Sequence, residues 1–223
     1  EEYASLLPYT LVFDSVSARR ELSAANALSD YPAEELLRRA DFNPHTKDRY
    51  VESSGTEVVI EGQRKLYLHT DGTLSYSGGA AEDGSLFAVS AADAAHISRA
   101  ELCAAARGLV GALTQGRIGD AALFLSGIES DDDGGATVFF DYMAGGTPIR
   151  FADGSHAAEV RIEGQSITAF SLRLRRYTLT ERDSLLLPLA LSRAIAQRYP
   201  GCELTVAYID SYGDSVGASW IAD

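Results

Sequence analysis

The sequence predicts an α+β fold of two duplicated units, each an antiparallel sheet packed by one helix, behind an N-terminal helical extension. Three observations support this prediction. Several runs alternate apolar and polar residues between Gly or Asp turns, which is typical of strands. Two other runs carry apolar residues at helical spacing. Finally, "EVVIEGQ" at 57–63 returns as "EVRIEGQ" at 159–165, identical at six of seven positions.

The first predicted unit spans 57–149 and has the order hairpin, helix, hairpin. Its first strands lie in 57–78, with turns at Glu61-Gly62 and Asp71-Gly72, where glycine accepts a positive φ. The segment 78–97 reads as an insertion. The predicted helix is 98–116, with Ser98 as N-cap and Glu101 completing a capping box. Its inward face consists of Leu102, Ala106, Leu109 and Leu113, and the closing strands are 121–128 and 136–143.

The second predicted unit, 150–223, repeats this order. A strand pair at 158–179 turns at Glu163-Gly164, and a helix follows at 180–201, capped by Thr180 and weakened at Pro188. The side chains that we expect to face inward from this helix are Leu185, Leu189, Ile195 and Tyr199. The last hairpin, "LTVAYIDSYGDSVGASWIAD" at 204–223, turns at Ser-Tyr-Gly-Asp.

Residues 1–56 form the predicted N-terminal helical extension, with one or two helices in 15–42, one of them opened by Pro32 in "PAEELLRRA". Because the first residue is Glu1 and the only methionine is Met143, we expect a segment upstream of the chain. A signal peptide, a membrane anchor and another domain are all compatible with this expectation.

Composition excludes some classes of partner. The formal net charge is −13, and a phosphate backbone requires a basic surface, so nucleic acid is a poor partner. The one basic run, "RLRRY" at 173–177, lies in an alternating pattern and predicts a solvated strand face.

Neither the histidines nor the cysteines form a recognisable catalytic or metal-binding motif, and we predict no catalytic, cofactor-binding or metal-ligating residue and no cofactor. The best ion candidate is the acidic run Glu129, Asp131, Asp132 and Asp133, which reads as a polar hairpin tip or as a weak calcium site. Cys103 and Cys202 read as free thiols, with a disulfide as the alternative.

Aromatic residues are concentrated in the predicted strands. They are Tyr67, Tyr76, Phe139, Phe140, Tyr142, Phe170, Tyr177, Tyr208 and Trp220. Such residues fill a core or, on an open sheet face, form a docking surface for a protein or peptide. The sequence leaves both roles open.

The run "ATVFFDYMAGGTPI" (136–149), followed by "EVRIEGQSITAFSLRLRRYTL", a helix and the final hairpin with its late Trp220, resembles the YycH and YycI family. Members of that family are extracytoplasmic regulators of a two-component system in Gram-positive bacteria. The likeness covers 136–223 and, loosely, the first unit. One departure is Ser219, where the family usually has proline before the tryptophan.

The resemblance implies a non-enzymatic regulatory domain outside the cytoplasm, held by an N-terminal membrane anchor. Its partners would be a sensor histidine kinase or a sister regulator, in a homo- or hetero-oligomer. One alternative is a secreted or anchored PepSY-like inhibitor or ligand-binding module. Another is an enzyme whose site is assembled from scattered acidic residues.

Overall fold

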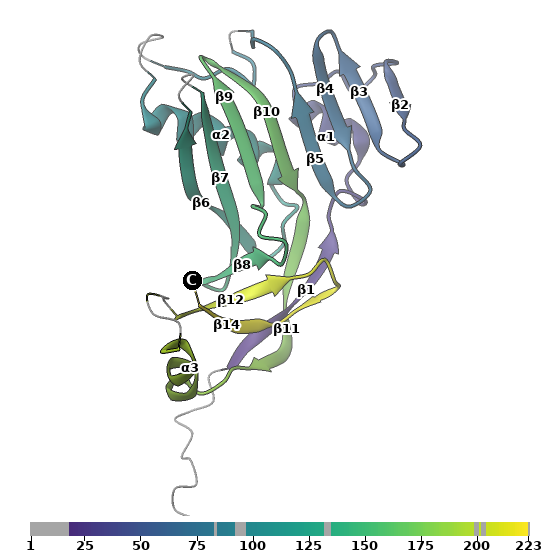
Figure 1. Cartoon of the computed structure of the whole chain (residues 1–223). Coiled ribbons are helices and arrows are strands. Elements are labelled where there is room, and N and C mark those ends of the chain that lie inside the picture. The colour runs from purple at the N-terminus through teal and green to yellow at the C-terminus, as the bar shows by residue number, and fades with distance from the viewer. Residues whose placement is uncertain are drawn as a thin grey trace, which may run out of the picture.

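The computed structural model describes residues 18–82, 84–91, 97–131, 135–198, 201 and 204–222, and it has the predicted α+β architecture (Figure 1). Its helices are α1 (Ala33–Arg39), α2 (Arg99–Thr114) and α3 (Leu189–Ala196). The strands are β1 (Ala18–Asn26), β2 (Arg49–Val51), β3 (Glu57–Glu61), β4 (Arg64–Leu68), β5 (Thr73–Ser77), β6 (Ala121–Ser130), β7 (Ala136–Ala144), β8 (Thr147–Phe151), β9 (Ala158–Glu163), β10 (Ser166–Arg173), β11 (Arg175–Leu185), β12 (Leu204–Asp210), β13 (Ser215–Val216) and β14 (Ala218–Ala222).

The larger sheet has the strand order β14-β12-β8-β7-β9-β10-β5-β4-β3-β2, and β6 pairs with β7 beside this path. All of these pairs are antiparallel except β12 with β8. The predicted turns are confirmed at Gly62, Gly72 and Gly164, which all have positive φ.

Helices α1 and α2 cover one face of the larger sheet (Figure 1). The capping box of α2 is present as predicted, with Glu101 N–H donating to the Ser98 hydroxyl. Ala106, Leu109 and Leu113 are fully buried, and Leu102 packs at the margin of the same cluster. Among the described residues, no helix is long and apolar enough to cross a membrane.

The smaller sheet, β11-β1-β13, is joined to the larger one by a continuous segment. β10 ends at Arg173 and β11 begins at Arg175, so the chain leaves one sheet and enters the other at Leu174. The amide of Leu174 donates to Gly72 O, and its carbonyl accepts from Ala27 N, both at 2.9 Å. The backbone at this bend is therefore bonded on both sides.

The predicted duplication into two sheets, each with its own helix, is not confirmed. β9 and β10, from the second predicted unit, lie between β7 and β5 of the first, in one sheet. Pairing in a sheet depends on long-range contacts that a repeat in the sequence does not specify. The boundary at 149/150 therefore does not separate two sheets.

The N-terminal extension is corrected in part. Helix α1 follows Pro32 as predicted, but residues 18–26 form strand β1 rather than a helix. The segment is rich in alanine, which favours a helix locally. Pairing with β11 and β13 overrides this preference and buries Leu22 and Ala24. Residues 1–17 lie outside the described part of the chain.

The helix predicted at 180–201 is also wrong in extent. Thr180 lies in β11, and the helix comprises only Leu189–Ala196, directly after Pro188. Proline lacks an N–H group and is tolerated at a helix start, so it begins this helix instead of kinking it. Leu185, Leu189 and Ile195 are exposed rather than inward, and Tyr199 lies outside the described residues.

Candidate functional site

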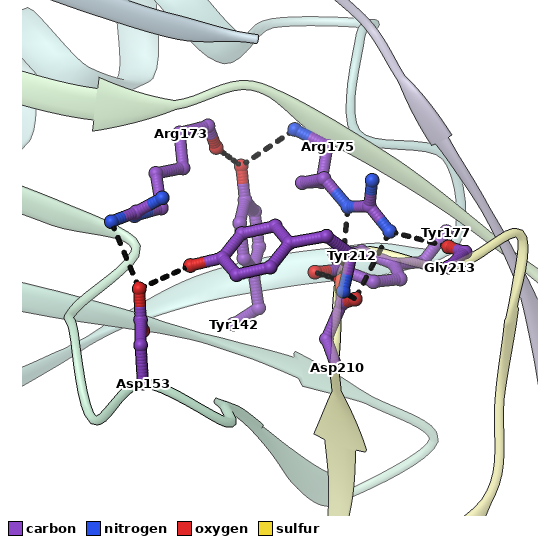
Figure 2. Close-up of polar contacts among 8 residues, drawn as sticks. All are labelled: Tyr142, Asp153, Arg173, Arg175, Tyr177, Asp210, Tyr212 and Gly213. Carbon is purple, nitrogen blue, oxygen red and sulfur yellow. Dashed lines mark hydrogen bonds and ion pairs between the residues drawn. The ribbon is translucent and has the colours of Figure 1, made fainter. Parts of the chain in front are cut away.

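A buried ion pair lies where the two sheets meet (Figure 2). Arg175 begins β11, and Asp210 ends β12. The guanidinium donates from Nε to Asp210 Oδ2 at 2.9 Å and from Nη2 to Oδ1 at 3.0 Å. The side chain of Asp210 is fully buried, and that of Arg175 is 8% exposed. Two parallel hydrogen bonds of this kind combine charge attraction with a fixed geometry.

Every part of this pair has further partners. Asp210 also accepts from Tyr177 OH at 2.7 Å and from the backbone amide of Tyr212 at 2.7 Å. Arg175 Nη2 donates to the Gly213 carbonyl at 2.7 Å. A buried charge is stable only when it is paired and hydrogen-bonded, and this condition is met here.

Two tyrosines hold the larger sheet against the pair. Tyr142 on β7 donates from its hydroxyl to Arg173 O at 2.7 Å, and its ring meets that of Tyr177 edge-on at 5.2 Å. Burial raises the pKa of both phenols well above the ordinary value, and the Asp210 carboxylate raises the pKa of Tyr177 further. Both phenols are therefore neutral and act as fixed donors.

The polar cluster continues to the surface through Tyr212, which adopts a left-handed φ of 65°. Its ring stacks on Phe151 at 5.6 Å, and its hydroxyl donates to Asp153 Oδ2 at 2.6 Å. Arg173 Nη2 lies 3.3 Å from the same carboxylate oxygen. The pKa of Asp153 is lowered by hydrogen bonds from Ser155 and then from Tyr212.

This cluster is a structural joint. Burial keeps the phenols of Tyr142 and Tyr177 neutral at neutral pH, and hydrogen bonds lower the pKa of Asp153, so none of these three acids is poised for proton transfer. The interpretation of "RLRRY" as a solvated face is therefore wrong for Arg175. A signal was present in the sequence, since Arg175 alternates in phase with Tyr177, and Asp210 with Tyr208. The sequence does not show that the strand of Arg175 and the strand of Asp210 meet, so the ion pair could not be predicted from it.

The acidic run shows no metal site in its described part. Asp131 forms an ion pair with Arg161, whereas Asp132 and Asp133 lie outside the described residues. Throughout the described chain, no three His, Cys, Asp or Glu side chains are placed to hold a metal ion. Glu129 is exposed at the end of β6.

His45, His69 and Cys103 lie apart from the joint. His69 contacts the hydroxyls of Thr56 and Ser75, and His45 lies in an exposed loop. Cys103 lies half-buried on α2 and forms no disulfide with a described residue. His96 and Cys202 lie outside the described part of the chain, so the disulfide alternative is not tested.

A serine, an aspartate and a histidine lie near one another on and beside β6 and β7, and this arrangement bears on the enzyme alternative. Ser126, Asp141 and His156 line a shared surface depression of about 450 Å³, and His156 Nδ1 lies 3.0 Å from Asp141 Oδ1. Ser126 and His156 both belong to the described part of the chain, and no hydrogen bond joins their side chains. A nucleophile needs contact with its base, so this arrangement lacks the geometry of an activated serine.

The aromatic residues divide between the two predicted roles. Six are buried: Tyr76, Phe140, Tyr142, Phe170, Tyr177 and Tyr208. Tyr67, Phe139 and Trp220 are half-buried. Most of the strand aromatics therefore belong to the core, and docking surfaces must be sought among other side chains.

Helix α3 lies at the lower end of the molecule (Figure 1), and the exposed apolar side chains of this helix and of the segment before it form a surface there. We call it the α3 patch, and it consists of Leu185, Leu187, Leu189, Leu191 and Ile195, which are 41–76% exposed. In the same helix Ser192 is buried, and its hydroxyl has no hydrogen-bond partner among the described residues. The helix thus turns leucines outward and a polar group inward, the reverse of an ordinary surface helix.

A second open surface is a groove of about 800 Å³ between α2 and β6, which we call the β6 groove. One wall is α2, from Ala100 to Thr114, and the other is the first half of β6. Its lining is mostly apolar. Pockets of this size are typical of ligand and peptide sites.

These features define the class as an α+β protein with a closed polar joint and two open apolar surfaces. No family model matches the chain, and no curated protein matches it. The crystal structure of YycH from Bacillus subtilis is similar, with a TM-score of 0.44 and 10% identity. The match covers 74% of this chain and 41% of that one, so the chain spans less than half of YycH. The structural resemblance to YycH predicted from the sequence is confirmed at this level.

Proposed function

We propose that the chain is a non-enzymatic, extracytoplasmic regulatory domain that modulates a sensor histidine kinase of a two-component system through protein contacts. The sequence resemblance to the YycH and YycI family suggests the kinase, or a sister regulator, as partner. The observation on the fold that supports a contact function is the α3 patch. An apolar surface that a folded domain leaves open is typical of an interaction site.

The position of the patch suits a protein held at a membrane. Ala18, the first described residue, pairs with Leu185 of the patch across β1 and β11. An anchor upstream of Glu1 would therefore tether the chain from the end of the fold that carries the α3 patch. The patch would then lie on the side of the domain that an anchored kinase can approach.

The test is direct binding between this chain and the extracytoplasmic domains of the sensor kinases of its source organism. We expect one of them to bind, and Leu189→Asp with Leu191→Asp to weaken that binding by about tenfold or more. Val51→Asp is the control, since Val51 is an even more exposed apolar residue and lies on β2, which is remote from α3 (Figure 1). It should leave the affinity unchanged.

Two results would contradict the proposal: no kinase domain binds, alone or with a sister regulator, or the patch variants bind like the control. A kinase reporter in cells gives the functional readout. Its output should change when the gene is deleted, and the patch variants should behave like the deletion.

The second candidate is a secreted or anchored PepSY-like inhibitor or ligand-binding module, and the β6 groove is the observation that favours it. A cleaved signal peptide in the full gene, in place of a membrane-spanning segment, would favour this candidate. Kinase binding that depends on the α3 patch would exclude it as the main function.

A further inference from the structure

Strand β6 has one open edge. It pairs with β7 along its length and with no other strand of the described chain. An open edge presents backbone N–H and C=O groups to which another strand can pair. The ten residues "AALFLSGIES" contain no lysine or proline to block such pairing. A bulge at Ser126 and the carboxylate of Glu129 affect only the second half, so Ala122–Leu125 is the unprotected stretch.

The β6 groove runs beside this stretch. Leu123 and Leu125 pair with Tyr142 and Phe140 of β7. Phe140 belongs to the core cluster under α2, and Tyr142 lies two residues along the same face of β7, so these leucines lie on the α2 side of the sheet as well. Leu125 is 47% exposed. The helix side of the groove has small residues, among them Ala104 and Gly111. A strand added to β6 would place every second side chain in this groove.

Arg107 gives the groove its charge. It is the one ionisable side chain among the lining residues apart from Cys103, and it forms no ion pair with any described residue. Elsewhere in the described chain, arginines such as Arg39, Arg161 and Arg175 are paired with carboxylates. A groove with an unpaired guanidinium over apolar walls favours an acidic group among apolar ones.

We propose that the β6 groove binds an extended peptide segment of a partner, which adds to the edge of β6 and inserts apolar side chains and one carboxylate between β6 and α2. The backbone pairs with Ala122–Leu125, the apolar side chains contact Leu123, Leu125 and Phe140, and the carboxylate meets Arg107. This is recognition by strand addition, with affinity from the backbone and specificity from alternate side chains.

The net charge of the chain favours a peptide segment of a different protein over a second copy of this chain as the occupant of the β6 groove. Each chain carries a net charge of −13, and pairing two β6 strands would bring two such chains together. A peptide with one acidic residue meets much less of this repulsion. The inference goes beyond kinase regulation and does not depend on it, because it concerns a surface away from the α3 patch.

The probe is the peptide Ser-Leu-Thr-Glu-Thr-Leu-Ser-Val-Thr, whose second, fourth, sixth and eighth side chains fall on one face. Binding is measured by calorimetry, and strand addition by hydrogen exchange of the β6 amides. Gly111→Leu should fill the groove, since a Cβ at Gly111 meets no atom within 4 Å. Gly108→Leu is the matched control, because its Cβ also meets open space but Gly108 does not line the groove.

We expect the peptide to bind the wild-type chain and to slow exchange at Ala122–Leu125. Gly111→Leu should weaken binding by about tenfold or more, and Gly108→Leu by less than about twofold. Arg107→Glu should weaken binding of this peptide, and the variant chain should bind a peptide with lysine in place of glutamate more tightly.

Four outcomes would overturn the proposal: no binding, equal binding by both glycine variants, binding without protection of β6, or indifference to the charge swap. Binding of a fatty acid in place of the peptide, without amide protection, would assign the groove to an acyl chain. A dimer that Gly111→Leu dissociates would assign it to a second copy. Both of these would replace the proposed occupant.

Discussion

Helices α2 and α3 are both rich in apolar residues but have opposite surroundings. α2 lies on the larger sheet and buries Leu109 and Leu113 completely. α3 follows β11 of the smaller sheet and contacts only the margin of the larger one at β12; it leaves Leu189 and Leu191 more than 40% exposed and buries Ser192. The difference comes from the neighbours. Strands β7 and β9 face α2, whereas α3 follows an extended segment that has already left the main sheet.

The two helices therefore have different roles: α2 stabilises the fold, and α3 offers a surface to a partner. Burial of apolar area against a sheet stabilises a fold, whereas the same side chains left in water supply a surface for a partner. We therefore expect substitutions to affect folding strongly in and under α2 and at the joint, and weakly in α3, where binding should change instead.

The largest expected effect concerns the joint that connects the two regions. Burial raises the pKa of Tyr142 and Tyr177, so folding stability is fully present below the ordinary tyrosine pKa near 10 and is lost as pH rises above it. Each phenol removes about 1.4 kcal/mol per pH unit in that window. Tyrosinate absorbance and circular dichroism should therefore change together at alkaline pH, and ionisation of these two phenols without unfolding would contradict the prediction.

Removal of one charge of the joint should lower the free energy of unfolding nearly as much as ionisation of the two phenols does. Asp210→Ala leaves the guanidinium of Arg175 buried without its partner, and we expect a loss of about 3 to 5 kcal/mol in the free energy of unfolding. Chemical denaturation measures it. Asp153→Ala is the control, since Asp153 is a partly exposed carboxylate at the outer end of the same cluster. Equal losses for the two variants would show that the buried pair has no special role.

A matched pair of leucines tests the comparison itself. Leu109→Ala in α2 creates a cavity in a fully buried place and should cost about 2 to 5 kcal/mol. Leu191→Ala in α3 removes the same atoms from a side chain that is 48% exposed and should change stability by less than about 0.5 kcal/mol. Thermal and denaturant unfolding give both values. If Leu191→Ala destabilised the fold as much as Leu109→Ala, the α3 patch would be part of a core.

The smallest of the losses in the α2 region should come from its cap. Ser98→Ala removes the hydroxyl that accepts from the Glu101 amide, and we expect a loss of about 1 kcal/mol. Ser98→Asp, which keeps an acceptor at the N-cap, should restore most of it. A loss that Ser98→Asp does not restore would mean that the cap is not its cause.

Local chemistry was readable from the sequence wherever near neighbours decide the structure. The turns at Gly62 and Gly164 require only a residue that tolerates positive φ, and Gly72 requires this too, although a Cβ there would also meet Asn26 Oδ1 at 2.7 Å. The capping box of α2 and its buried face depend on spacing within one helix. Strands β6, β7, β9 and β10 follow from alternation, and so do β12 and β14 of the final hairpin, but β13, directly after the turn at 211–214, joins β1 in the smaller sheet instead.

The tertiary structure decided everything that depends on which strands meet. It turned the alanine-rich 18–26 into a strand and placed β9 and β10 beside β5 and β7. It also brought Arg175 to Asp210, which are 35 positions apart in the chain. Sequence alone determined an α+β protein with these turns and with helix α2. The joint and both open surfaces came from long-range pairing, because burial of a charge and exposure of a leucine depend on neighbours that local patterns do not specify.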